Sequence, residues 1–211
     1  MFADLGIPFP LFAAPTAEAL GYYSRAACGV CGVTAAHAFT ARADGAEVVA
    51  CYACLRGNRA WVPKETEVGA VSAYSAARGQ TDAVGIPRSE VERLGFRMVP
   101  HELEPQLPDW GHVLVPAADL AELIRTPDFL TWQGCRWLFC CGRPMVYVGA
   151  WKEAQFEARA GGADPAAFFR SVVPGCPPFE WGRHAPLSGA GGPYVFRCQD
   201  CGRHRGYVDM P

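Results

Sequence analysis

The alternation of apolar and polar residues predicts a chain of short strands joined by turns. Residues 36–41 and 46–50 have strand patterns, and Asp44-Gly45 between them is a hairpin turn signal. Further short apolar runs predict strands at residues 112–115, 145–148 and 194–197, the last of them buried. No element is expected to be long.

Helices are expected between these strands. Pro116 begins one that places Leu120, Leu123 and Ile124 on a single face, and Thr126-Pro127 ends it. The other expected helices are a surface helix at residues 152–160, a helix that Asp164-Pro165 opens and that runs to residue 173, and a short helix that a capping-box pattern at residues 89–92 opens and Gly95 ends. The mixture predicts an α+β fold.

The organisation along the chain follows from local composition. Residues 1–27 are rich in proline and aromatic residues, which predicts an extended arm whose rings join the core. We therefore expect an arm and finger lobe over residues 1–60 and an α+β body over residues 61–211. No linker is long enough to separate them, so they should form one integrated domain.

Composition narrows the class of protein. The chain has 211 residues, of which 50% are hydrophobic, so it is globular and large enough for a core. A net charge of −2 supplies no general attraction for nucleic acid or membrane, although a local basic patch stays open. The first residues make a poor signal peptide, and no apolar run approaches the roughly 18 residues of a membrane helix. These features predict a cytoplasmic protein.

The strongest chemical signal is a pair of C-x-x-C motifs, Cys28/Cys31 and Cys51/Cys54. Each motif offers two thiolates to one side of a tetrahedral ion, and the hairpin at residues 36–50 would bring the pairs together. Gly32 lets the loop curl around the sulfurs. We expect a structural zinc site in a treble-clef-like or ribbon finger.

The alternatives to a zinc site at these cysteines are buried free thiols, a disulfide pair, or a thioredoxin-like redox motif. The redox motif opens a helix directly after a strand, and the residues before Cys28 do not have that pattern. Two pairs at this spacing favour zinc over packing alone, and clustered pairs among 10 cysteines favour metal in a reducing compartment over a disulfide scaffold.

A second zinc site is expected where the motif recurs. Cys198 and Cys201 are followed by a glycine, as are Cys140 and Cys141, and we predict that these four cysteines bind a second zinc. Cys135, Cys176 and His204 are the alternative ligands. Cys135 and Cys176 fit better as small buried hydrophobes.

No enzyme signature accompanies these sites. The chain lacks H-E-x-x-H, a deaminase signature, G-x-S-x-G, a P-loop and G-x-G-x-x-G. A zinc held by four thiolates has no open position for water, so we expect a non-enzymatic protein. The cluster of Arg197, Arg203, His204 and Arg205 is expected to be a solvated rim around the thiolates, with a phosphate-binding or acidic-surface-binding patch as the alternative.

The aromatic residues point to a core rather than to stacking platforms for bases. No tryptophan is interleaved with a basic run. We expect a core position for these tryptophans: Trp110, Trp132, Trp137, Trp151 and Trp181.

Several blocks resemble the bacterial CbrC family. They are residues 193–202 and 206–209, residues 125–133 with Trp137 and Cys141-Gly142, residues 147–149, and the early cysteine motifs with Leu55 and Asn58. Cys140 stands where that family has a histidine, which exchanges one type of zinc ligand for another. Residues 65–115 have no counterpart in the family pattern.

The resemblance implies a role without catalysis. The family is named for tolerance to a nuclease-type colicin, so it implies a protein that protects bacteria from a protein toxin by binding a toxin domain. The alternatives are a nucleic-acid-binding zinc-ribbon protein, motivated by the arginines near Cys201, and a C-x-x-C thiol oxidoreductase. The sequence sets neither the partner nor the oligomeric state.

Overall fold

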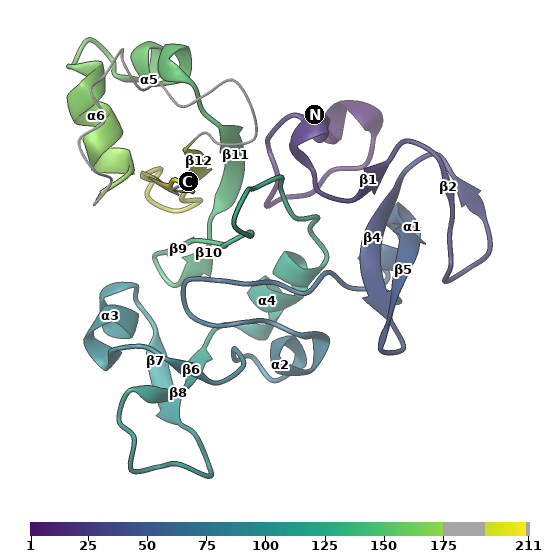
Figure 1. The fold of residues 1–211 in the computed structure, drawn as a ribbon, viewed down its shortest axis with the longest axis horizontal. Helices are drawn as coiled ribbons and strands as arrows, with labels where there is room; N and C mark the ends of the chain where they lie inside the picture. Colours follow the sequence, from purple (N-terminus) through teal and green to yellow (C-terminus); the bar gives the residue numbers. More distant parts are fainter. Residues whose placement is uncertain (175–192, 210–211) are drawn as a thin grey trace.

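Short elements follow one another in the order that Figure 1 shows. The structure is a computed structural model that describes residues 1–174 and 193–209. Two 3-10 turns lie in the arm, η1 (Ala3–Leu5) and η2 (Thr16–Glu18). The helices are α1 (Tyr52–Arg56), α2 (Ala73–Ala77), α3 (Arg88–Arg93), α4 (Ala117–Ile124), α5 (Glu153–Arg159) and α6 (Pro165–Val172).

The strands form small antiparallel sheets rather than one large sheet. In spatial order these are β1-β4-β5, β2-β3, β6-β8-β7, β9-β10 and β11-β12-β13. Their bounds are β1 (Tyr22–Tyr23), β2 (Ala26–Ala27), β3 (Thr34–Ala35), β4 (Ala38–Ala43), β5 (Ala46–Cys51), β6 (Val84–Gly85), β7 (Arg97–Pro100), β8 (Trp110–Leu114), β9 (Phe139–Cys140), β10 (Arg143–Pro144), β11 (Val146–Ala150), β12 (Tyr194–Arg197) and β13 (His204–Tyr207). The predicted α+β class is confirmed.

The β4–β5 hairpin of the finger has the predicted turn. Asp44 and Gly45 both have positive φ, 50° and 81°, which matches the twist that a two-residue hairpin turn requires. The strands pair from Ala43↔Ala46 to Ala38↔Cys51. This register returns Cys51 to the start of β4, beside the first cysteine motif.

Helix α4 confirms its predicted face, whereas the predicted cap of α3 is wrong. Leu120, Leu123 and Ile124 are all buried. Helix α3 begins at Arg88 after Pro87, and no side chain caps it, because the fixed φ of Pro87 leads the chain into the helix instead of Ser89. The structure places a capping box in α2, where Ser72 and Ser75 exchange hydrogen bonds.

The C-terminal sheet carries the predicted strands at residues 145–148 and 194–197. Strand β12 lies between β11 and β13, and the first three of its four residues are buried. Helices α5 and α6 lie at this end of the molecule (Figure 1). Asp164 caps α6 by accepting hydrogen bonds from the N–H groups of Ala166 and Ala167, as its position before Pro165 predicts.

The N-terminal arm is part of the core, as its aromatic content predicts. Phe2, Phe9 and Phe12 are buried, and the ring of Phe2 makes edge-on contacts with both of the others. The arm also bonds to β11, since the N–H of Ala13 donates to the carbonyl of Tyr147 at 2.8 Å. The main core includes residues from Phe2 to Cys198. The division at residue 60 stays a prediction.

The prediction that all five tryptophans are buried is wrong for Trp132. Trp137 and Trp151 are buried and Trp110 is half-buried, whereas Trp132 is 69% exposed. It lies in the loop between α4 and β9. Trp181 lies outside the described residues.

Among the described residues, no helix combines the length and apolar character that crossing a bilayer requires.

Two candidate metal centres

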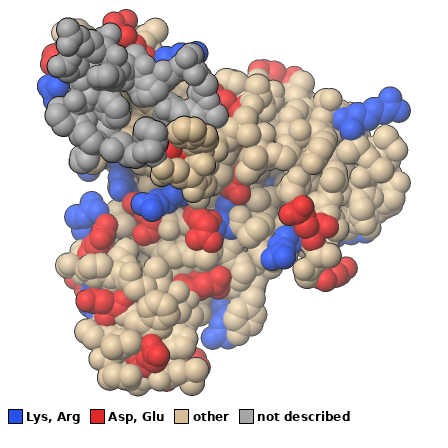
Figure 2. All heavy atoms as spheres, viewed as in Figure 1, with Lys and Arg blue, Asp and Glu red and all other residues tan. Residues whose placement is uncertain are grey.

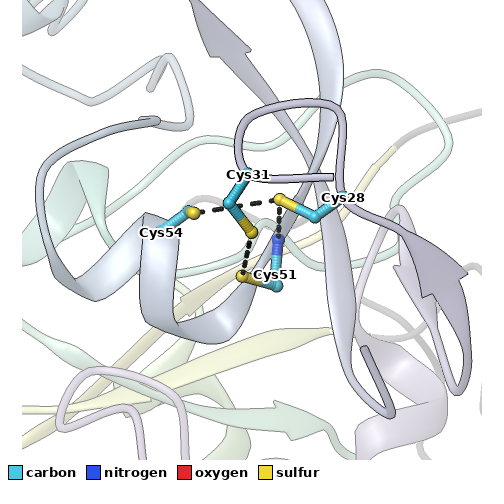
Figure 3. Close-up of side chains that lie close together, drawn as sticks. All are labelled: Cys28, Cys31, Cys51 and Cys54. Carbon is cyan, nitrogen blue, oxygen red and sulfur yellow. Dashed lines mark hydrogen bonds between the residues drawn. The ribbon is translucent and has the colours of Figure 1, made fainter. Parts of the chain in front are cut away.

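The first cysteine tetrad consists of Cys28, Cys31, Cys51 and Cys54. The first two flank the turn between β2 and β3, Cys51 ends β5, and Cys54 lies on α1. Gly32 has φ of 76°, so the loop curls around the sulfurs as predicted. Figure 3 shows the four side chains converging from these elements. The second pair thus lies on a strand end and a helix, the treble-clef-like variant of the predicted finger.

The sulfur positions fit a tetrahedral ion. The Sγ atoms of Cys28 and Cys54 are 3.8 Å apart, as are those of Cys31 and Cys51. Four sulfurs at zinc's usual bond length of about 2.3 Å are separated by tetrahedral edges of about 3.8 Å. All nine cysteines in the described part of the chain are free thiols, so no disulfide competes for these sulfurs.

The backbone of the finger favours one thiolate in this tetrad. Burial opposes ionisation of Cys28, but the N–H groups of Cys51, Cys31 and Val30 outweigh it and lower its pKa to about 6. Burial and the neighbouring sulfurs raise the pKa of Cys54 to about 12. Several thiolates therefore cannot share this space without a cation to offset their repulsion.

The second tetrad consists of the predicted four residues: Cys140, Cys141, Cys198 and Cys201. Cys140 ends β9, Cys141 begins the β9–β10 turn, and Cys198 and Cys201 lie in the turn after β12. The Sγ of Cys140 is 3.7 Å from that of Cys201 and 3.8 Å from that of Cys141. The spacing again matches a tetrahedral edge.

Adjacent cysteines reach one centre because the turn adopts an unusual conformation. Cys141 has φ of 53°, in the left-handed region that non-glycine residues rarely adopt, and Gly142 follows at 75°. The N–H of Gly142 donates to the carbonyl of Leu94 at 3.2 Å, which fixes the turn against the end of α3.

The electrostatics of the second tetrad resemble those of the first. The N–H of Arg203, followed by the thiol of Cys198, lowers the pKa of Cys201 to about 7. Burial and the neighbouring sulfurs raise the pKa of Cys140. Both tetrads are thus compatible with structural metal sites.

Of the alternative ligands, Cys135 and His204 lie in the described part of the chain, and neither joins the second tetrad. The thiol of Cys135 donates to the carbonyl of Phe129 at 2.8 Å, and burial raises its pKa to about 12. The ring of His204 packs on Trp151, with centroids 5.0 Å apart, and burial lowers its pKa. Cys176 lies outside the described residues.

The arginine cluster beside the second tetrad is divided between surface and interior. Arg197 and Arg203 are exposed, but Arg205 forms a bidentate ion pair with Glu67 at 2.7 and 2.9 Å and also donates to the carbonyl of Phe139. The prediction of a solvated rim is therefore wrong for Arg205, because its partner lies far away in the sequence. Figure 2 shows acidic and basic side chains interspersed on the visible face.

Sequence reasoning also missed the buried pair Lys64 and Asp128. The Nζ of Lys64 lies 2.6 Å from a carboxylate oxygen of Asp128 and 5.1 Å from the ring centre of Trp137. Its side chain is 0% exposed. An isolated lysine in a mixed segment carries no signal for burial, because burial depends on a partner that only the fold supplies.

Comparison with known proteins finds a family that part of the chain is similar to. Residues 115–210 match the model of an uncharacterised protein family, UPF0167. This region contains the second tetrad, and the family carries no established function. No curated protein and no solved structure matches the chain.

Proposed function

We propose that this chain is a non-enzymatic protein, stabilised by two zinc ions, that acts by binding another protein. The four-sulfur geometry of both tetrads carries the proposal. A tetrahedral ion with four cysteine ligands has no position for water or substrate, so its contribution is to stability. Soft thiolates in tetrahedral order favour zinc or an iron–sulfur centre, and a single ion fits the sulfur spacing of 3.7 and 3.8 Å.

An exposed, fixed tryptophan supports the protein-binding part of the proposal. The N–H groups of Trp132 and Gln133 both donate to one carboxylate oxygen of Asp209, at 2.7 and 2.9 Å. The loop is tied a second time by the N–H of Arg136, which donates to the hydroxyl of Tyr207. Trp132 is thus held in place while 69% of it faces solvent, and such residues are frequent anchors of protein interfaces.

The toxin-tolerance role comes from the resemblance to the CbrC family. Two of the blocks that carry it, residues 125–133 and 206–209, are the segments that the Asp209 hydrogen bonds join. We therefore propose that a domain of a nuclease-type bacterial toxin is the partner. A reducing cytoplasm fits this role, because the thiolates must stay unoxidised to hold zinc.

Metal content is the first test. Native mass spectrometry of the purified full-length chain should show two zinc ions, and element analysis should find no iron. If the chain carried no metal after purification from zinc-supplemented cells, the zinc proposal would be contradicted.

Protection from a toxin is the second test. Bacteria that express the chain should survive a nuclease-type colicin concentration that kills cells with an empty vector. The purified chain should bind the toxin's nuclease domain in calorimetry, and Trp132→Ala should weaken binding by about 30-fold, as for an interface hot spot. Tyr74→Ala removes another aromatic, 70% exposed, and is the matched control. Equal killing and no binding would reject the toxin role.

A further inference from the structure

We propose that the second tetrad is a thiol-oxidation site, at which a hydroperoxide joins Cys140 to Cys201 and thereby releases that tetrad's metal ion. The first tetrad is expected to keep its ion under the same conditions. The inference rests on the proposed zinc sites but needs no protein partner.

The two tetrads differ in their access to solvent. In the first, Cys28, Cys51 and Cys54 are buried, at 2%, 7% and 2% exposure, and belong to the main core, and Cys31 alone of the four is exposed. In the second, Cys141 and Cys201 are exposed, Cys140 is half-buried and only Cys198 is buried. A dissolved oxidant can therefore reach three sulfurs of the second tetrad but only one of the first.

The positions of the sulfurs select the bond that forms. Cys140 and Cys201 come from separate hairpins, and their sulfurs are 3.7 Å apart, so a small movement brings them to the length of a disulfide. Cys141 is the direct chain neighbour of Cys140, and consecutive Cα atoms about 3.8 Å apart are closer than the usual 4.4–6.8 Å of a disulfide. The geometry therefore favours Cys201 as the partner of Cys140.

The reaction balances with hydrogen peroxide as oxidant. The thiolate sulfur of Cys201 attacks one peroxide oxygen, the O–O bond breaks, and hydroxide leaves to take up a proton as water. The thiolate of Cys140 then attacks the sulfenic sulfur of Cys201, the S–O bond breaks, and a second water forms. Two cysteines lose two electrons, the peroxide gains them, and only Cys141 and Cys198 are left for the ion.

Loss of the ion would act on a strained part of the chain. Cys141 has φ of 53°, and the adjoining Gly142 bonds to the carbonyl of Leu94. With the metal–sulfur bond gone, the turn is free to relax, and its contact with the end of α3 should loosen. The expected change is therefore local to the β9–β10 turn and α3, while the finger stays folded.

The test uses the zinc-loaded full-length chain and hydrogen peroxide. A zinc-binding dye should report early release of about one ion per chain, with the other released at least about 10-fold more slowly, because three of the four sulfurs of the first tetrad are buried. Peptide mass spectrometry without reduction should find Cys140 linked to Cys201. Dithiothreitol and added zinc should restore the starting metal content.

Cys135→Ala is the control, since this half-buried thiol lies outside both tetrads. It should leave the release and the disulfide unchanged. Equal release from both tetrads, a first disulfide among residues 28–54, or a Cys140–Cys141 bond would overturn the inference. A chain that carries no zinc rejects the proposed metal content before peroxide is added, and mapping its first disulfide still tests the preference for Cys140 and Cys201.

Discussion

Arg205 and Glu67 join the last strand to a loop 138 positions earlier through two parallel hydrogen bonds. Their side chains are only 22% and 12% exposed. Glu67 also accepts a hydrogen bond from the N–H of Phe139, next to the second tetrad. The pair therefore fixes β9, which ends at Cys140, and β13, which follows Cys201, independently of any metal.

Glu67→Gln should destabilise the protein by about 2 kcal/mol, because it leaves the Arg205 charge without its counterion in a half-buried place. The free energy of unfolding in urea measures this. Glu90→Gln is the control, since its pair with Arg93 is exposed on both sides and should contribute less than about 1 kcal/mol. If both variants lost the same free energy of unfolding, the pair of Arg205 with Glu67 would stabilise the fold no more than an exposed pair does.

Cys54→Ala should remove one zinc ion and destabilise the finger by at least about 3 kcal/mol, because its sulfur is buried among three other ligands. Cys135→Ala should keep both ions. Metal content and thermal melting distinguish the variants. If Cys54→Ala retained two zinc ions, this cysteine would not be a ligand.

Tyr147→Phe tests how the arm is held to β11. The hydroxyl of Tyr147 donates to Glu18 at 2.7 Å, and the N–H of Ala150 donates to the same carboxylate oxygen at 2.8 Å. Losing the first bond should cost about 1–2 kcal/mol in urea unfolding, since it is a charge-assisted bond in a partly buried place. Tyr52→Phe removes an exposed hydroxyl bond to the carbonyl of Pro8 and should cost less. A larger effect at Tyr52 would contradict this ranking.

The thiol of Cys135 should make the stability of the fold depend on pH. Burial raises the pKa of its thiol from 9.0 to about 12 in the folded chain. Between these values the unfolded chain gives up a proton that the folded chain keeps, so this group's contribution to stability falls as pH rises from 9 to 12. Stability of Cys135→Ala should decline less over pH 9–10.5 than that of the parent. Parallel declines would show that the Cys135 pKa is unshifted.

Spacing predicted the two tetrads because the ligands of a structural zinc typically come in short local pairs, and Cys28 and Cys198 each begin such a pair. Helix α4 was equally predictable from the sequence, since Leu120, Leu123 and Ile124 repeat with the helical period. Arg205 was misjudged because its partner Glu67 is remote and has no motif. Trp132 was misjudged because hydrophobicity predicts burial only on average, and nothing in its neighbours marks a loop that Asp209 holds open to solvent.

The docking of the N-terminal arm on β11 has a consequence for synthesis. The arm leaves the ribosome well before the backbone of Tyr147, which accepts from Ala13 and donates to Leu11. The finger has its four cysteines as soon as residue 54 emerges. A nascent chain must therefore carry Phe12 without the ring of Tyr147, its neighbour in the folded chain, while most of the body is translated, a period in which a chaperone that shields aromatic segments would have its greatest effect.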